Sequence, residues 1–574
     1  MTLRRAWMGA VAVFVAVLEA VAAIPSRAST YAVYIPLDDP IYTELETLNG
    51  LGYLYTYLDE IKPISRVEAA RLTLEAEEQL EASTAPAPLA KSLIRTLRMQ
   101  LHEEVGWLES NSEDDLPTMA HPLERMQLQY IYSDGNPRRW QTSPIGTQQQ
   151  CCINAEEATP LLPNNDGLPT ASGSNEVASL YGWAGAGGFL AGYADGALAG
   201  PLTHDTSGIS RLQPIAAAAV ASLGNLAISF GLEQMWWGVG YFNSLSQSNN
   251  ASPFPALRLQ NIHPFLLPWF FRYLGQFRTQ FVFGEMNDSG YRYFSNPYLF
   301  GQNFVFKPLP TFELGFDHMI MFGGRHNDNY SFGGFLGRAT GFDTGNPNNG
   351  NTHSRGGLYF RFYFPSLRNS QLYFETMGND NLAYEVPGVG HFLPFLSVSY
   401  LAGIYVPRLT EDGLTDLRFE FEYTDVNEEQ HDDSLYWAYE GQLMGTSLGP
   451  NATQVDLQLG RWIALRNKLS ADFFYTQQAP YCCSNGPSGS SGFAFPAAYY
   501  PYPLASEHSE GVAFDFLQLP RPLPILSESL ATLRARAAVE YAQSLNYQAH
   551  ADSVRFLLMF SGALTPGWPS WIWK

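Results

Sequence analysis

Hydrophobic and polar residues alternate with a period of two along much of the chain after His121. The clearest runs lie at 312–322, 358–364 and 417–423. In each run one set of positions is rich in Phe and Leu, and the other carries charges, hydroxyl groups or glycine. Strands of this kind fit a β-sandwich, which buries the apolar face against a second sheet. They also fit a transmembrane β-barrel, which turns that face toward lipid and the other toward its lumen.

Two observations favour the barrel. The apolar faces are long and rich in Phe and Leu, and aromatic residues gather near strand ends, as at Trp269-Phe270-Phe271 and Tyr499-Tyr500, where interfacial girdles lie. At about 25 residues per strand with its connection, the residues after Ala120 give about 18 strands.

Further strands are predicted where shorter runs show the same pattern: 125–132, 225–231, 276–284, 303–307, 371–376, 401–406, 455–462, 471–475, 533–541 and 554–560. The Gly- and Ala-rich run at 181–200 predicts less regular strands. Three long connections, at 343–355, 428–449 and 480–517, are expected as loops at the outer mouth or as inserts in the lumen.

The region 31–111 has a helical rhythm instead. Leu45, Leu48 and Leu51 recur at helical spacing. Ser65 and Glu68 stand at the spacing of a capping box, in which the Ser side chain bonds the N3 amide and the Glu side chain reaches back. After the proline break at 85–88, a last helix is expected at 89–108.

The N-terminus resembles a secretory signal peptide. Arg4 and Arg5 precede a mostly apolar run at 6–23, and small residues suit cleavage after Ala23 or Ala28. An N-terminal membrane anchor is the alternative. No later stretch has about 18 uninterrupted apolar residues. The sequence therefore predicts an exported chain without a membrane-spanning helix. Its possible destinations are then the extracellular medium, the periplasm and the outer membrane.

Composition narrows the choice further. Aromatic residues make up 14% of the chain and charged residues only 15%, a balance that favours a β-rich protein. The mean hydropathy of −0.14 does not oppose a barrel, because alternating lipid-facing and lumen-facing residues average out. The net charge of −22 argues against nucleic acid as a partner, since phosphate binding requires clustered Lys and Arg.

The four cysteines form two vicinal pairs, Cys151-Cys152 and Cys482-Cys483. Because an exported chain meets oxidising conditions, disulfides are expected, with three possible connectivities. Bridges between the two loops are favoured, because a vicinal disulfide requires a strained ring. No His lies at short spacing from either pair, so we expect no metal site.

Catalytic chemistry finds little support. Asp317 and His318 are neighbours on a predicted strand and point to opposite faces, so they form no dyad. The chain has no GxSxG elbow and no phosphate-binding loop. Asn/Asp-rich loops lack the spacing of an EF-hand. We therefore expect no cofactor and no enzymatic activity.

The stretch 229–261 carries the most informative motif. It contains Trp236-Trp237, Gly238-Val239-Gly240, Asn249-Asn250 and Pro253. It resembles the signature of the Wzi-like capsule-assembly family of outer-membrane proteins, roughly Trp-Gly-Pro-Gly, Ser-Leu and Asn-Asn-Ala-Arg-Pro. Val239 stands where the family usually has Pro, and Ser252 where it usually has Arg. The motif residues admit two roles: packing in the wall or against a lumen plug, or contacts to sugar rings.

The resemblance implies a signal peptide at 1–28, a periplasmic helical module at 29–115 and a monomeric outer-membrane barrel at 116–574. It further implies a lectin-like protein that associates with capsular or surface polysaccharide and helps to retain or assemble it at the cell surface. Outer-membrane lipid and the barrel-assembly machinery are then further partners. The alternative on the same architecture is a porin or substrate-specific channel.

Overall fold

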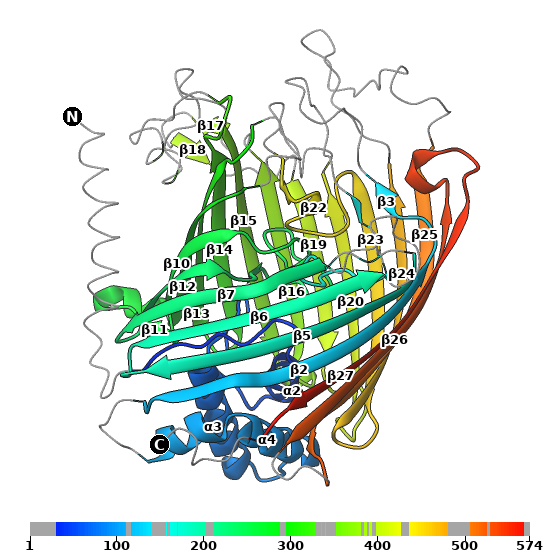
Figure 1. Ribbon diagram of the computed structural model, residues 1–574. Coiled ribbons are helices and arrows are strands. Elements are labelled where there is room, and N and C mark those ends of the chain that lie inside the picture. The colour runs from blue at the N-terminus through cyan, green and yellow to red at the C-terminus, as the bar shows by residue number, and fades with distance from the viewer. Residues whose placement is uncertain are drawn as a thin grey trace, which may run out of the picture.

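The protein is a closed antiparallel β-barrel of 18 long strands with a small helical region at one end (Figure 1). The computed structural model describes residues 30–110, 116–139, 156–157, 161–168, 170, 172–201, 211–287, 294–327, 335, 339, 352–379, 384–386, 390–392, 398–425, 436–479, 505–524 and 529–567. The predicted barrel and its strand number are confirmed. The signal peptide and all four cysteines lie outside the described residues.

The barrel strands follow one another around the wall in chain order, and the last strand, β27, pairs with the first, β2. They are β2 (Met119–Asp134), β5 (Gly173–Ala186), β6 (Leu190–Pro201), β7 (Arg211–Leu223), β8 (Leu226–Leu232), β10 (Pro255–Asn261), β12 (Gln276–Glu285), β13 (Tyr298–Leu309), β14 (Phe312–Phe322), β15 (Thr352–Phe364), β16 (Ser370–Asn379), β19 (Val398–Val406), β20 (Thr415–Thr424), β23 (Ala452–Trp462), β24 (Asn467–Gln478), β25 (Glu507–Pro522), β26 (Leu530–Gln543) and β27 (Ser553–Thr565). The two-residue strand β11 (Phe265–Leu266) adds to β12 beside β10.

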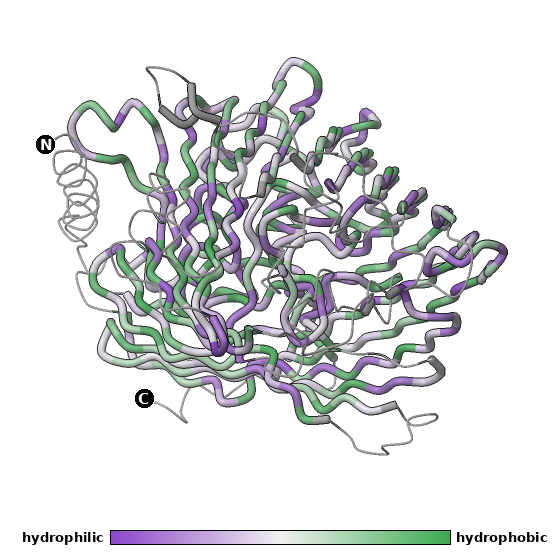
Figure 2. Tube along the Cα trace, turned by 90° about the horizontal axis from the view of Figure 1, so that it is seen from above, coloured by the Kyte–Doolittle hydropathy of each residue, from purple (hydrophilic) through white to green (hydrophobic). Residues whose placement is uncertain are grey.

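Hydrophobic and hydrophilic residues alternate along the strands of the wall (Figure 2). Because successive side chains of a strand point to opposite faces, this alternation separates the two faces of the wall. On β15, Tyr359 and Arg361 are buried inside the barrel, whereas Phe362 and Phe364 are exposed on its outer surface. Closure of the wall leaves no second sheet to cover those phenylalanines, so the β-sandwich alternative is wrong. The apolar outer face and the closed ladder satisfy the two demands of a lipid bilayer, apolar contact and internal backbone pairing.

Several strands depart from the sequence-based expectation. β25 begins at Glu507, inside the connection expected at 480–517, and β15 begins at Thr352, inside the one expected at 343–355. The run at 181–200 forms two regular strands, β5 and β6, joined by a short turn. Strands β7 and β10 were not predicted. The Ala run of β7 gives no contrast between its two faces, and β10 has only seven residues, so its alternation of Leu257 and Leu259 with Arg258 and Gln260 is short.

The helical region has four helices, namely α2 (Ile41–Leu51), α3 (Arg66–Ala82), α4 (Pro88–Gln100) and α5 (His102–Glu109). Ser65 caps α3 by accepting a hydrogen bond from the Glu68 amide at 3.1 Å, as predicted. The Glu68 carboxylate does not complete the box and instead binds Arg71 at 2.7 Å and His263 at 2.6 Å. The helix expected at 89–108 is divided at Leu101 into α4 and α5. Among the residues described, no helix is long and apolar enough to cross a membrane.

The two ends of the barrel differ. At the end beside the helices, successive strands are joined by short turns, as between β7 and β8 or β13 and β14. At the opposite end the connections are long, as between β16 and β19 or β24 and β25. Between the ends, a hydrophobic core lies inside the lumen and includes Trp237, Leu245, Phe254 and Trp437. The lumen is therefore packed with protein rather than left as an open pore.

Candidate functional site

The signature stretch forms a loop at 233–254 that leaves the wall after β8, enters the lumen and returns as β10. Its paired tryptophans form the short strand β9 (Trp236–Trp237), which pairs antiparallel with β1 (Ile61–Lys62) from the N-terminal region. The backbone of Gly238 continues this contact by donating to the Glu60 carbonyl at 3.0 Å. The loop and the N-terminal region thus share one small sheet inside the barrel.

Trp237 anchors the loop against the barrel wall. Its side chain is fully buried, and its indole N–H donates to Gln280 Oε1 on β12 at 2.5 Å. Gly301 on β13 makes room for the ring, because a Cβ at that position would lie 2.8 Å from the indole. Burial of an indole with its polar atom paired is the arrangement that makes a large aromatic residue stabilising.

The glycines of the motif allow a close approach to a wall carboxylate. Gly238 has φ +134°, which non-glycine residues rarely adopt. A Cβ on it would lie 2.3 Å from a carboxylate oxygen of Glu375. A Cβ on Gly240 would lie 2.0 Å from the Asn243 carbonyl oxygen. Both positions therefore require glycine for steric reasons.

Three inward-facing carboxylates of the wall hold the loop, two of them by its backbone and one by a side chain. Glu375 on β16 accepts hydrogen bonds from the amides of Val239 at 3.1 Å, Leu245 at 2.9 Å and Ser246 at 3.2 Å. Glu420 on β20 accepts from the amides of Tyr241 at 2.6 Å and Phe242 at 3.1 Å. Glu422 accepts from the Asn243 side chain at 2.9 Å. A buried amide that loses its acceptor costs about 1–3 kcal/mol, so this contact set fixes the loop firmly.

The asparagine pair joins the loop to two other lumen segments. The Asn249 side chain donates to Asp166 Oδ1 at 2.8 Å and to the Asn164 carbonyl at 3.0 Å. The Asn250 side chain donates to the Leu443 carbonyl at 3.2 Å and accepts from the Asn164 amide. Pro253 is buried beside them. Both amide groups are therefore occupied by protein partners.

The segment that supplies Leu443 belongs to a predicted connection, 428–449. Its described part, from Tyr436, forms a hairpin of β21 (Ala438–Tyr439) and β22 (Gln442–Leu443) that packs into the lumen core through Trp437 and Met444. The lumen is thus filled by the signature loop, this hairpin, the segment 161–168 and the N-terminal region.

The N-terminal region is tied to the wall by polar contacts. Arg278 on β12 donates to the carbonyls of Leu58 at 2.9 Å and Pro63 at 3.3 Å. Arg361 on β15 pairs with Asp59, and Arg418 on β20 pairs with Glu46. Burial opposes ionisation of Glu68 in α3, yet Arg71 and His263 hold the pKa of its carboxyl at about 2. Ionised pairs therefore fix the helical region across the barrel end.

Two cavities remain inside the barrel along β23–β26. The larger, of about 450 Å³, lies between α2, the signature loop and the wall, and is lined by Arg534, Lys468 and Trp236 among others. The smaller, of about 80 Å³, lies farther along the same strands beside Gln454, Thr476 and Glu540. Pro163, Phe242, Asp472 and Arg536 line both cavities. These four residues lie between the two cavities, and Arg536 binds Asp515 there at 2.6 Å.

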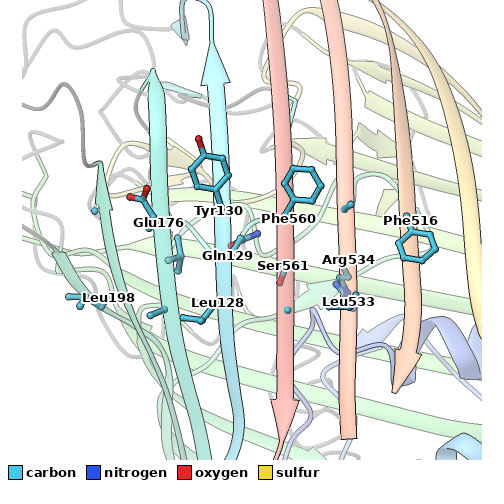
Figure 3. A pocket seen from close by; sticks show the side chains of 15 residues that line it. Leu128, Gln129, Tyr130, Glu176, Leu198, Phe516, Leu533, Arg534, Phe560 and Ser561 are labelled. Carbon is cyan, nitrogen blue, oxygen red and sulfur yellow. The ribbon is translucent and has the colours of Figure 1, made fainter. Parts of the chain in front are cut away.

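A further hollow, of about 750 Å³, lies on the outer face of the wall. Figure 3 shows its lining on β25–β27, β2, β5 and β6. The large side chains are those of the outward face, including Leu128, Leu198, Leu533 and Phe560, over a floor of small residues such as Gly562. On a lipid-facing surface such a hollow is filled by acyl chains, so it says little about recognition of a polar ligand.

The other candidates from the sequence are readily placed. Asp317 points into the barrel and His318 to the other face, so the two do not form a dyad. Within the described ranges no cluster of His, Cys, Asp and Glu is arranged to hold a metal. The seven signature residues come together, but they were found by resemblance alone. The wall carboxylates that hold the loop around them, Glu375 and Glu420, carried no distinguishing signal.

Comparison with known proteins decides the family. A sequence model described as "Capsule assembly protein Wzi" matches residues 145–547, more than two thirds of the chain. The chain belongs to this Wzi family. No curated protein sequence matches it. The structure is similar to that of Wzi from Escherichia coli, described as an outer-membrane protein involved in group 1 capsule assembly and a carbohydrate-binding β-barrel. That match has a TM-score of 0.61 at 16% identity and covers 92% of this chain and 99% of the other.

More distant likenesses are to Pseudomonas aeruginosa outer-membrane proteins. OprD matches with a TM-score of 0.39 at 8% identity, over 77% of this chain and 94% of that one. OccD3 (OpdP) matches with a TM-score of 0.41 at 10% identity, over 77% and 93%. The family and the lipid-facing closed barrel together place this Wzi-family chain in the bacterial outer membrane.

Proposed function

We propose that this barrel associates with exported capsular or surface polysaccharide and helps to retain or assemble it at the cell surface, without chemical conversion. Membership of the Wzi family supports the substrate class. The observation that carries the proposal is the packed lumen: four chain segments fill it and leave no wide channel for a polymer. The polymer is therefore expected to bind at one end of the barrel.

The end with long connections is the natural place for that contact. In outer-membrane barrels short turns face the periplasm and long loops face the exterior. By this rule the helical region, within 29–115, faces the periplasm and the barrel occupies 116–574. We propose that the outer connections supply the sugar contacts. The signature residues Trp236, Trp237, Asn249 and Asn250 hold the plug instead, because protein groups pack around all four and already bond the side chains of three of them.

The proposal is tested by replacing outer connections with short Gly/Ser turns. Replacement of 426–435 or 480–504 should abolish binding of purified barrel to surface polysaccharide and should release polymer from cells into the medium. The matched control replaces the turn 408–413 at the opposite end, which should leave both readouts unchanged. Wild-type binding in all three variants would contradict the assignment, as would cells lacking the protein that keep all their polymer. Hydrolysis of the polymer would contradict the non-catalytic part.

We further propose that the chain is a monomer that is inserted by the barrel-assembly machinery and surrounded by outer-membrane lipid. Large apolar side chains cover the outer face of the wall, including Leu212, Phe230 and Phe514, and a lipid environment accounts for them. Light scattering of the detergent-solubilised protein tests the oligomeric state, and a dimer mass would contradict the monomer.

A second candidate function, passage of small ions or solutes, is favoured by the two cavities along β23–β26. Inward-facing Lys468, Asp472 and Arg536 line this strip of wall, and the four shared lining residues, Phe242 among them, lie between the cavities. If ions pass there, Phe242→Ala should raise the conductance in planar bilayers, while outward-facing Phe514→Ala should not. Absence of current in both the wild type and Phe242→Ala would exclude this function.

A further inference from the structure

The connection between β10 and β12 first extends the wall as β11, where Phe265 pairs with Phe277 of β12, and then continues on the outside of the barrel. Arg278 on β12 points inward to the Leu58 carbonyl, so its neighbour Phe277 faces outward. Phe277 is nevertheless buried, because Phe265 and Leu267 of the connection cover it. The rings of Phe265 and Phe277 meet edge to face at 5.5 Å. The connection therefore lies on the face of the wall that contacts lipid.

The middle of this connection presents a run of exposed aromatic residues. The 3₁₀ helix η1 (Trp269–Leu274) has no buried residue. Trp269 is 76% exposed, Phe270 67% and Tyr273 73%, and Phe271 and Leu274 are exposed beside them. An apolar cluster of this density on a protein surface marks a contact with another apolar phase.

Contacts at both ends of η1 hold the helix in its exposed position. Gly275 ends the helix with φ +74°, and a Cβ there would lie 1.7 Å from the Lys307 carbonyl oxygen, so the helix end is pressed against β13. On the other side, Phe265 and Leu267 fix the entry. Packing at both ends therefore holds the aromatic side chains away from the wall.

Arg272 is the single cation of η1, and no acidic partner of Arg272 lies among the described residues. In the part of the chain that the structure describes, Arg272 makes no ion pair, and its guanidinium lies over the Tyr273 ring at 5.1 Å and donates to the Tyr273 hydroxyl at 3.3 Å. Arg, Tyr and Trp each combine an apolar stem with a polar tip, the combination that settles at the headgroup level of a bilayer.

Apolar residues on the neighbouring turns continue the band at this end of the barrel. Leu266, Leu309 and Leu367 are all exposed at the short-turn end. The surface of η1 is thus continuous with the lipid-facing wall, and it lies where that wall ends.

We propose that η1 is a membrane-interface anchor that binds phospholipid headgroups of the leaflet at the short-turn end. Trp269, Phe270 and Tyr273 enter the boundary between headgroups and acyl chains, and the Arg272 guanidinium pairs with a lipid phosphate. A phospholipid fits better than a second copy of the chain, because η1 joins the lipid-facing wall and its free charge is complementary to phosphate.

The position of Trp269 can be measured on the full chain in phospholipid vesicles. The difference in emission between the wild type and Trp269→Phe isolates this indole. Phospholipids brominated near the headgroup should quench it strongly, and aqueous acrylamide should quench it weakly. The control Tyr55→Trp in the Trp269→Phe background places an indole on the helical region and should show the opposite pattern. Quenching of Trp269 by acrylamide alone would overturn the proposal.

The charge of Arg272 gives an independent readout. In vesicles that contain phosphatidylglycerol, Arg272→Glu should lower the melting temperature of the barrel below that of the wild type. Arg272→Lys keeps the positive charge and should melt at the wild-type temperature. In detergent without phosphate the three proteins should melt together. Lys91→Glu on the exposed face of α4 is the matched control and should have no lipid-dependent effect. Equal melting of all variants in vesicles, or a dimer that dissociates on Trp269→Ala, would contradict a lipid contact.

Discussion

The two halves of the barrel lumen use the same kind of residue for different purposes. Along β12–β20, inward-facing Glu375 and Glu420 bind the backbone of the signature loop, and the space is filled. Along β23–β26, inward-facing Asp472, Asp515 and Arg536 bind one another, and two cavities remain. The same alternation of apolar and polar residues along the strands gives both walls their inward-facing charges. The difference is whether a loop covers the charged groups.

The two walls differ in how they offset the free-energy cost of burying a carboxylate. A buried carboxylate is costly unless it is hydrogen-bonded, and the covered wall meets this demand with fixed backbone amides. The other wall meets it with the Arg536 side chain beside a cavity. Substitutions should therefore disturb the covered wall much more than the uncovered one.

The largest effect is expected from Glu375→Ala. It leaves three buried backbone amides without an acceptor, which should cost about 3–6 kcal/mol of loop docking. Limited proteolysis of the folded barrel should then cut the loop at 233–254, which resists cleavage in the wild type. Asp515→Ala on the uncovered wall is the control. Equal protease resistance of both variants would remove the distinction between the walls.

The next effect is expected from Trp237→Ala, which leaves a cavity in the filled half and loses the bond to Gln280. The free energy of unfolding in denaturant should fall by about 3–5 kcal/mol. Phe474→Ala, on the wall of the 80 Å³ cavity, should cost less because its surroundings are already loosely filled. A larger loss for Phe474→Ala would reverse the comparison.

A smaller effect is expected from Gly238→Ala, since a methyl group there meets the Glu375 carboxylate and forces an unfavourable φ. We expect a loss of about 1–3 kcal/mol in the same denaturation experiment. Gly106→Ala in α5 is the matched control. A Cβ there meets no atom within 4 Å, so it should be neutral or stabilising by about 0.5–1 kcal/mol.

The strands were predictable from sequence where their outward side chains contact lipid and are therefore large and apolar. The alternating Phe and Leu residues of β14, β15 and β20 indicate a lipid-facing surface. β14 and β20 lie close to the bounds of the pattern, whereas β15 begins six residues earlier, at Thr352. β7 was missed because Ala side chains give no contrast between its two faces. β25 was missed because a turn-rich segment precedes it and hides its start.

The plug was less predictable than the wall. The motif identifies the loop through Trp237 and Gly238, but the wall holds the backbone amides of the loop with an ordinary Glu residue, Glu375. A lumen-facing Glu that docks a loop looks the same in sequence as one that lines water. The partners of Asn249 lie 83 and 85 residues away, and no local pattern connects them.

The most specific effect concerns the contact between the segment 161–168 and the signature loop, where Asp166 accepts from Asn249 at 2.8 Å. Burial, with the nearby Asp38 charge adding to it, raises the pKa of Asp166 to about 7, although the Asn249 bond opposes the rise. In the unfolded chain the pKa of Asp is about 3.9. The folded state therefore holds a proton that the unfolded state has lost between these values. Its stabilising effect is complete below about pH 4 and is lost as the pH rises to about 7.

Asp166→Asn should remove that dependence, because the amide cannot ionise and still accepts from Asn249. Protease resistance of the loop in the wild type should weaken between pH 4 and 7, with a slope of at most about 1.4 kcal/mol per pH unit. The variant should be flatter over this range and more resistant than the wild type at pH 8. Asp412→Asn, on an exposed turn at the other end, should retain the wild-type profile. Identical profiles for Asp166→Asn and the wild type would show that Asp166 ionises freely. Water would then reach Asp166 more readily than its burial implies.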